Sequence, residues 1–301
     1  MNASPIPLMH IESLPYHSVM ADLRQLRAFV AVADAGTFTD AAIDLGVSQA
    51  AVSRTVAALE RDLGVSLLHR TPRGADPTPL GHELLPQARR VLAEMEAFAD
   101  LAHAQRRVLR LGYAWAAVGR HTPTLLREWA ARHPETELRL VRHVSATAGL
   151  AEGLCDVAIV RVDVDPTRFD AVVVGLERRL VVFRDDDPWL KRRSVTMAEI
   201  AERTVLVDSR TGTTRAELWP SDAQPQVRAI HDVDGWLDAI AAGQGVGTTS
   251  EATIAHHQRA GIAHRRIGDG PRIPVRLAWR RDAPPPAAAV LAELLGELYD
   301  R

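Results

Sequence analysis

The stretch "VSQAAVSRT", residues 47–55, groups side chains that can contact the edges and backbone of DNA. Gln49 can form two hydrogen bonds to adenine, and serine hydroxyls can reach bases or phosphates. Arg54 suits a phosphate group, and Ala50 and the methyl group of Thr55 suit contact with thymine methyls. The candidate DNA-contacting residues are Ser48, Gln49, Ala50, Ser53, Arg54 and Thr55. A solvated helix face would show the same residue types. These residues therefore indicate DNA binding only if the chain positions them to reach DNA.

The surrounding pattern predicts three short helices. Apolar residues recur at helical spacing over 23–35, and Gly36 ends that segment. A second helix is expected over 38–45, and Gly46 then supplies a turn because glycine adopts positive φ at little cost. Ser48 can cap a third helix, whose Val52, Val56 and Leu59 form a buried stripe. Two helices joined by such a turn form a helix-turn-helix, which presents the start of its second helix to the major groove.

A small hairpin, or wing, is expected next, in "LGVSLLHRTPRGADPTPLG". Pro77 has no N–H, so its strand should lie at an edge. Arg70 and Arg73 in this wing could grip the neighbouring DNA backbone. Thr78 and Pro79 are a helix start signal, and we expect a helix from 79 to about 107. Its long apolar stripe needs a partner surface, which we expect to be a second copy of the chain.

Composition limits the alternatives. The chain has 301 residues, 47% of them hydrophobic and 25% charged, with a net charge of −2. These are ordinary values for a globular protein, with no general excess of positive charge to attract nucleic acid. Residues 20–76 themselves carry six arginines against seven acidic residues, so a DNA-binding role must rest on local placement. No apolar run approaches the ~20 residues that span a bilayer.

Two further features indicate the cellular compartment in which the protein works. The one cysteine, Cys155, excludes an internal disulfide and fits a small core residue. The first residues have neither a basic segment nor a continuous apolar one, so they do not resemble a secretory signal. We expect residues 1–19 to be a disordered arm, or an upstream start that the working protein does not need.

Beyond residue 107 the pattern changes to alternating strands and helices. Strands are expected over 108–113, 136–143 and 155–162, and helices over 122–134 and 146–154. The strand expected over 155–162 is almost continuously apolar. Alternation of helices with apolar strands is typical of an α/β sheet covered on both faces. The alternation continues to a last amphipathic helix near the C-terminus.

Motifs that would indicate an enzyme do not hold up. "GQGVG", residues 243–247, follows a helical run and precedes a strand, whereas a phosphate-binding loop needs the order strand, loop, helix. His256 and His257 are adjacent, so their rings do not share one helical face for a metal ion. Asp163 and Asp165 fall in a loop before a proline, where solvated carboxylates are expected. We therefore predict no catalytic residues, no metal site and no cofactor.

The order of the N-terminal pieces resembles the DNA-binding domain of LysR-type transcriptional regulators. The resemblance is carried by "LRQLRAFVAVADAGTFTDAAIDLGVSQAAVSRTVAALERDLGVSLLHRT", residues 23–71, and extends loosely to the C-terminus. The sequence departs from the family in two places: Leu68 stands where the family usually has phenylalanine, and Pro77-Thr78 stands where it usually has leucine-threonine. The resemblance implies base and phosphate contacts for Ser48, Gln49, Ser53 and Arg54.

The resemblance also implies the overall architecture. We expect an N-terminal winged helix-turn-helix over 20–78, a long linker and dimerisation helix over 79–107, and a C-terminal two-lobed α/β effector domain like a periplasmic binding protein over 108–301. Lobe one would be 109–181 plus 268–301, and lobe two 182–267. The two crossovers are expected near 181–184 and 265–268.

In such a domain an effector binds in the cleft, at strand C-termini and helix N-termini. The residues expected there are Trp115, Ala116, Ser145, Thr147, Arg161, Asp208, Ser209, Arg210, Thr211, Thr213, Thr248 and Thr249. Arg161 and Arg210 could hold a carboxylate, and Trp115 could form a stacking wall, which would suit a small aromatic or mixed polar-apolar effector. The alternative is that both arginines are ordinary ion-pair partners and Trp115 is core.

The sequence thus predicts a cytoplasmic regulator that binds a pseudo-palindromic site on double-stranded DNA as a dimer or tetramer and responds to a small molecule. Two other interpretations stay open. A solute-binding or catalytic α/β protein with a helical appendage would need an export signal or a catalytic constellation. A helix-turn-helix repressor without an effector would leave the large second domain without a use.

Overall fold

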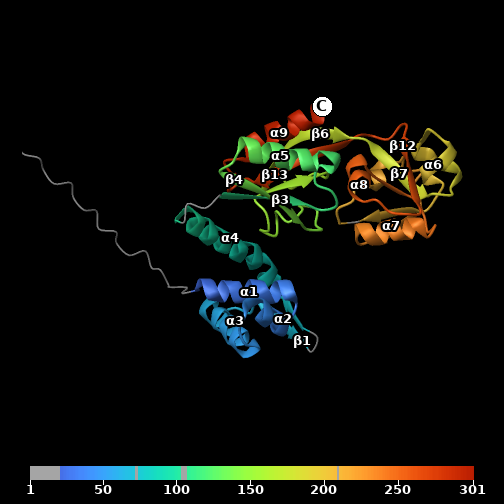
Figure 1. The fold of residues 1–301 in the computed structure, drawn as a ribbon. Helices are drawn as coiled ribbons and strands as arrows, with labels where there is room; N and C mark the ends of the chain where they lie inside the picture. The colour runs from blue at the N-terminus through green and yellow to red at the C-terminus, as the bar shows by residue number, and fades with distance from the viewer. Residues whose placement is uncertain (1–20, 72–73, 103–106, 209) are drawn as a thin grey trace, which may run out of the picture. The chain divides into compact units, whose positions relative to one another are not determined.

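The computed structural model describes residues 21–71, 74–102, 107–208 and 210–301 (Figure 1). The expectations for residues 1–19, Arg73 and Ser209 therefore lie outside the described part of the chain. The chain divides into two compact units, Met1–Glu94 and Met95–Arg301. Each unit has hydrophobic core of its own.

Three helices form the core of the first unit: α1 (Leu23–Ala35), α2 (Phe38–Leu45) and α3 (Gln49–Leu63). Each begins at a side-chain cap, which satisfies backbone N–H groups that have no partner inside the helix. Asp22, Thr37 and Ser48 supply these caps, and Asp22 forms a capping box with Gln25. Gly46 adopts φ 66°, which makes the turn between α2 and α3. The predicted helix-turn-helix is confirmed, with Val52, Val56 and Leu59 buried as expected.

The wing follows as a two-stranded antiparallel hairpin of β1 (Leu68–Thr71) and β2 (Gly74–Pro77). Pro77 ends its strand in this two-stranded sheet, where its missing N–H breaks no interior ladder. The hairpin is tied to the helices because Ala75 N donates to Gly36 O at 2.7 Å. Glu60 Oε1 accepts the backbone N–H groups of Leu67 and Leu68, which fixes the entry to β1.

The long helix α4 (Pro79–Ala102) starts where expected, with the Thr78 hydroxyl accepting Gly81 N at 2.9 Å. It was expected to reach residue 107, but Arg107 already begins a strand. Its first half packs on the three helices through Leu85 and Ala88. Farther along, Val91, Met95 and Phe98 recur at helical spacing and are exposed, Phe98 by 66%.

The second unit holds two α/β lobes. Lobe one has a five-stranded sheet in the order β4-β3-β5-β13-β6. The strands are β3 (Arg107–Tyr113), β4 (Thr136–Arg142), β5 (Val157–Val160), β6 (Phe169–Glu177) and β13 (Ile273–Arg280). One face is covered by α5 (Thr122–Arg132), preceded by the short η1 (Gly119–His121), and by α9 (Ala288–Asp300), as Figure 1 shows. Ala148, Leu150 and Cys155 pack on the other face.

The helix expected over 146–154 does not form, and a series of turns takes its place. Ala148 and Gly149 adopt positive φ values of 52° and 94°, which no α-helix accommodates. The hydroxyls of Ser145 and Thr147 accept the N–H groups of Gly149 and Ala151. Local side-chain hydrogen bonds therefore replace helical ones.

Lobe two has a four-stranded sheet in the order β11-β7-β12-β8 and a parallel pair of β9 with β10. The strands are β7 (Arg179–Arg184), β8 (Ser194–Val195), β9 (Val205–Asp208), β10 (Val227–Ile230), β11 (Gly247–Ser250) and β12 (Ile262–Ile267). The helical elements are η2 (Pro188–Lys191), α6 (Met197–Ala201), η3 (Ala216–Leu218), α7 (Val233–Ala241) and α8 (Glu251–His256). Residues of α6 and α7 belong to separate core clusters that share the strands of this lobe.

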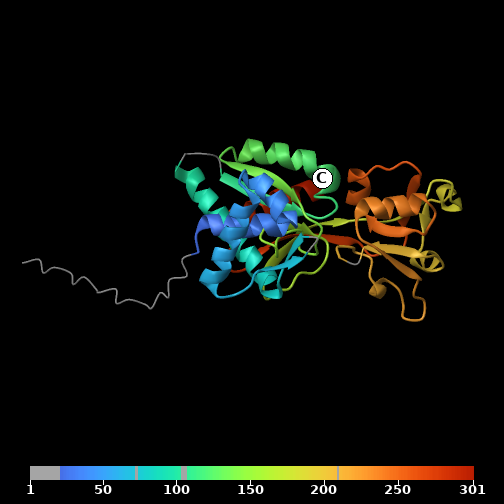
Figure 2. The same cartoon turned by 90° about the horizontal axis from the view of Figure 1, so that it is seen from below.

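The chain crosses between the lobes at two neighbouring points (Figure 2). Glu177 ends β6 and pairs with Ile273 of β13, while Arg179 begins β7 in the other sheet. The first crossover is therefore at residue 178, not at 181–184, because Val181 lies inside β7 and pairs with Thr248 and Arg265. The second crossover runs from the end of β12 at Ile267 to Ile273.

Candidate functional sites

The start of α3 presents the polar side chains expected to contact DNA. Ser48, Gln49, Ala50 and Arg54 are exposed at this end of the helix. The Ser48 hydroxyl accepts Ala51 N at 3.2 Å, so it caps the helix and shares its oxygen with any other partner. Gln49 and Arg54 are the exposed long polar side chains of this turn, and they can reach furthest from the helix axis.

The other expected DNA contacts are placed differently. Ser53 and Thr55 are half-buried, and the Thr55 hydroxyl donates to Ala51 O at 2.9 Å, which directs it along the helix. The backbone of Arg70 lies in β1 of the wing.

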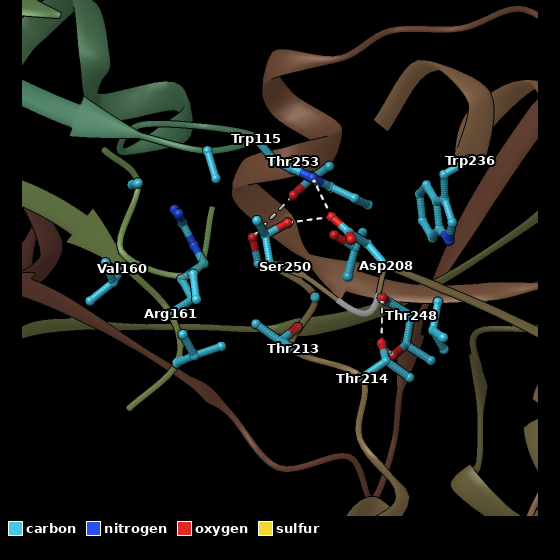
Figure 3. A pocket seen from close by; sticks show the side chains of 18 of the residues that line it. Trp115, Val160, Arg161, Asp208, Thr213, Thr214, Trp236, Thr248, Ser250 and Thr253 are labelled. Atoms are coloured by element: carbon cyan, nitrogen blue, oxygen red, sulfur yellow. Dashed lines mark hydrogen bonds between the residues drawn. The ribbon is translucent and has the colours of Figure 1, made fainter. Parts of the chain in front are cut away.

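The second candidate site is a cavity between the lobes of the second unit (Figure 3). Its walls come from the carboxyl ends of β3 and β5 in lobe one and of β9 and β11 in lobe two. Ligands of α/β proteins bind at such strand ends because the chain there turns away from the sheet and leaves a crevice. Of the expected residues, Trp115, Ser145, Arg161, Asp208, Thr211, Thr213, Thr248 and Thr249 line this cavity.

Asp208 and two tryptophans form one wall. The Trp115 indole N–H donates to Asp208 Oδ2 at 3.1 Å, so a side chain of lobe one bonds to a carboxylate of lobe two. The ring centroids of Trp115 and Trp236 are 5.4 Å apart. Asp208 is 3% exposed and also accepts Arg210 N at 2.9 Å and the Thr211 hydroxyl. The loop after β9 requires glycine at 212, because a Cβ there would lie 2.2 Å from Asp208 O.

Hydroxyl groups line another part of the cavity. Thr214 and Thr248 are joined by a 2.7 Å hydrogen bond between their hydroxyls, and Ser250 and Thr253 approach to 3.5 Å. Trp236, Thr214, Ser250 and Thr253 were not among the residues expected from the sequence. Helix α8 begins directly after β11, so Thr253 lies in the first turn beyond the strand end. A hydroxyl so placed was the signal that could have identified it.

Arg161 forms an internal ion pair with Glu177. Its guanidinium donates to both carboxylate oxygens of Glu177, at 2.8 and 2.7 Å, and to the carbonyl oxygens of Ala116 and Ala117, each at 2.8 Å. Glu177 is 2% exposed and also accepts the Tyr299 hydroxyl at 2.7 Å. The interpretation of Arg161 as a carboxylate anchor is therefore not supported, because four hydrogen bonds already occupy most of its five donors.

Three other expected residues do not reach the cavity. Ala116 is buried, and only its carbonyl has a role, as an acceptor for Arg161. Thr147 bonds to Glu152 and Ala151 in the turns that precede β5. Arg210 is exposed, and its guanidinium donates to His231 O.

A second buried arginine lies beside the first crossover. Arg179 donates to Pro271 O at 3.3 Å and to Thr213 O and its hydroxyl at 3.1 and 3.3 Å. Burial lowers the pKa of Arg179 to about 10, because the charged form loses its hydration. Arg179 thus ties the crossover to the loop that carries Thr213, but it does not line the cavity.

The cavity is small, with a volume of about 50 Å³. Sites for drug-sized ligands have volumes of ~300–1,000 Å³. The arrangement therefore admits only a group of a few atoms, and a larger molecule requires the lobes to separate.

Other kinds of site find no support in the described residues. No group of three or more histidine, cysteine, aspartate and glutamate side chains there could hold a metal ion. Among the helices that the structure describes, none has both the length and the apolar character to cross a bilayer. Cys155 is buried, and burial raises the pKa of its thiol, so the reactive thiolate is disfavoured.

Comparison with known proteins agrees with this architecture. Residues 23–82 match the model of the bacterial regulatory helix-turn-helix protein of the lysR family, and residues 102–300 match the LysR substrate binding domain. A probable cat1 operon transcriptional activator of Acinetobacter lwoffii is 29% identical over 293 residues, 92% of this chain and 96% of that protein. A probable hydrogen peroxide-inducible genes activator of Mycobacterium avium is 32% identical over 200 residues, 64% of each chain.

Solved structures show the same fold. The crystal structure of CbnR, a LysR family transcriptional regulator, superposes with a TM-score of 0.70 at 25% identity and covers 92% of this chain and 99% of that one. Two family models, one for each unit, together span nearly all of the described residues. The chain belongs to the LysR family: it is a helix-turn-helix transcriptional regulator with an effector-binding domain, and not an enzyme.

Proposed function

We propose that the chain reads DNA through α3 and responds to a small molecule bound in the cavity between its two lobes. The observation that carries the DNA half is the capped start of α3, where Gln49 and Arg54 are exposed together. Gln49 would read a base edge in the major groove and Arg54 would hold a phosphate. Ser48, Ala50, Ser53, Thr55, Arg70 and Arg73 would supply the remaining contacts.

The working assembly is a homodimer, or a tetramer built from two dimers, joined through α4. Val91, Met95 and Phe98 form an exposed apolar stripe on that helix, at spacing that suits a helix–helix seam. A two-fold dimer requires a pseudo-palindromic operator, because each recognition helix reads one half-site. We place the assembly in the cytoplasm, because its DNA target lies there and a chain with one cysteine suits a reducing compartment.

The effector acts by favouring one arrangement of the lobes. The Trp115–Asp208 hydrogen bond joins the lobes across the cavity, so a ligand that bonds to Asp208 competes with it. A ligand changes such an equilibrium only by binding one arrangement more tightly than the other. A thiol-based response to peroxide is not part of this proposal, because Cys155 is the one cysteine and is buried.

Selection from a pool of random duplexes tests the DNA half and does not require the operator sequence to be known. The full chain is expected to enrich one sequence with two-fold pseudo-symmetry, its half-sites centred about 10 base pairs or a multiple apart. A final pool with no more sequence bias than a pool carried through without protein would contradict the proposal.

A further inference from the structure

The cavity between the lobes has one uncompensated charge. Of the described residues that line it, only Asp208 and Arg161 are ionisable acids or bases. The charge of Arg161 is matched by Glu177 through two hydrogen bonds. What remains in the lining is the negative charge of Asp208.

Among the described residues, the groups that donate hydrogen bonds to the Asp208 carboxylate are all neutral. They are the Trp115 indole, the Thr211 hydroxyl and the backbone N–H of Arg210. In the described part of the chain no lysine, arginine or histidine side chain pairs with Asp208, and the Arg210 guanidinium is directed to His231 O instead. A carboxylate that is 3% exposed loses its hydration, and neutral hydrogen bonds replace only part of it.

The surroundings of Asp208 suit a cation. Trp115 and Trp236 line the same cavity as Asp208, and the face of an indole ring attracts a positive charge. Ser250 and Thr253 line the same cavity (Figure 3). With Thr249, which also lines it, they add hydroxyl oxygens that can accept hydrogen bonds. Arg179 is buried without a carboxylate partner in the described residues, but it does not line the cavity, and its guanidinium donates to Thr213 and Pro271.

We propose that the effector carries a positively charged nitrogen, most simply a primary ammonium group on a short stem, which binds the Asp208 carboxylate between the two lobes. This inference rests on the proposed function, since it names the chemical class of the molecule that occupies the same cavity. It replaces the carboxylate effector that Arg161 and Arg210 suggested from the sequence. A short stem follows from the cavity volume of about 50 Å³.

The competing explanation is that Asp208 only braces its own loop. Its backbone carbonyl accepts Gly212 N at 2.9 Å and its side chain accepts Arg210 N, so the carboxylate does organise residues 208–212. A bracing role needs hydrogen-bond acceptors but no net charge. The two explanations therefore differ in whether the sign of a ligand's charge matters.

Three probes of similar size and different charge separate these explanations: n-propylammonium, n-propanol and propionate. Each is titrated into the full chain at matched ionic strength while the melting temperature is recorded. We expect n-propylammonium to bind at least tenfold more tightly than either other probe, because it alone can form a charge-assisted hydrogen bond to the Asp208 carboxylate. The Asp208→Asn variant, which keeps a carbonyl acceptor, should lose that preference.

The matched control is Asp222→Asn, which removes the same charge from an exposed position outside the cavity lining. It should bind n-propylammonium as the wild type does. The inference is overturned if propionate or n-propanol binds as well as n-propylammonium, if Asp208→Asn keeps the preference, or if no probe binds. The same preparation is also tested by selection from random DNA duplexes. If the ammonium inference is wrong, the chain still enriches a specific DNA sequence. If the proposed regulator function is wrong, the DNA selection itself fails.

Discussion

Replacing Glu177 with alanine is expected to destabilise the effector-binding unit by about 3–5 kcal/mol. Glu177 is 2% exposed and receives two hydrogen bonds from Arg161 and one from Tyr299. Its removal leaves the Arg161 guanidinium buried without a counter-charge, and the penalty of an unpaired buried charge exceeds the worth of the contacts themselves. Chemical denaturation followed by intrinsic fluorescence measures the loss.

Two further variants make this prediction specific. Glu293→Ala removes an exposed glutamate from α9 and should change the free energy of unfolding by less than about 0.5 kcal/mol. The double variant Arg161→Met, Glu177→Leu removes both charges and should lose less stability than Glu177→Ala alone. If Glu177→Ala were no less stable than Glu293→Ala, the ion pair would have no structural role.

The same pair makes stability depend on pH. Burial alone would raise the pKa of the Glu177 carboxyl, but the Arg161 charge and the hydrogen bonds from Arg161, Tyr299 and Ser250 outweigh it and hold the pKa below its usual value. A carboxyl with a lowered folded-state pKa contributes stability above its unfolded pKa of about 4.3 and loses it as pH falls through the folded value. The stability gap between wild type and Glu177→Ala should therefore narrow below about pH 4.

Replacing Gln49 and Arg54 together with alanine is expected to abolish sequence-specific DNA binding. A two-bond contact to a base contributes about 1–3 kcal/mol of discrimination, and loss of a phosphate contact weakens binding to all sequences and lowers the salt slope by about 1. Fluorescence anisotropy with the selected duplex and a scrambled duplex, over a range of salt concentrations, separates the two contributions. The double variant should bind both duplexes equally.

Arg61→Ala provides the control on the same helix. Arg61 is exposed in the last turn of α3, away from the end that carries Gln49 and Arg54. Its loss also removes one positive charge but should leave the preference for the selected duplex intact. Equal loss of specificity in both variants would mean that general charge, and not the start of α3, governs recognition.

The sequence predicted the DNA-binding unit well because its signals are local. Ser48 caps α3 through Ala51, three residues away, and Gly46 forms the turn that precedes it. Val52, Val56 and Leu59 are spaced so that a helix must bury them on one side. Each of these features depends on neighbours within one or two helical turns, so the spacing of residues in the sequence is enough to predict it.

The cleft was predicted less completely because its contacts are distant in sequence. Trp115 and Asp208 were expected at strand ends, and both line the cavity, but the bond between them joins residues 93 positions apart. Arg161 was interpreted as a ligand anchor because nothing local identifies Glu177, on another strand, as its partner. Arg210 follows β9 as expected, yet its side chain is directed away to His231.

Footprinting of the DNA upstream of the chain's own coding region, with the purified full chain, is the most direct measurement of whether it is a sequence-specific regulator. We predict saturable protection of a discrete site, with two half-sites about one helical turn or a multiple apart, that weakens as salt is raised and is lost in the Gln49→Ala, Arg54→Ala variant. Protection no better than on random DNA of the same length, and unchanged by the two substitutions, would contradict the account.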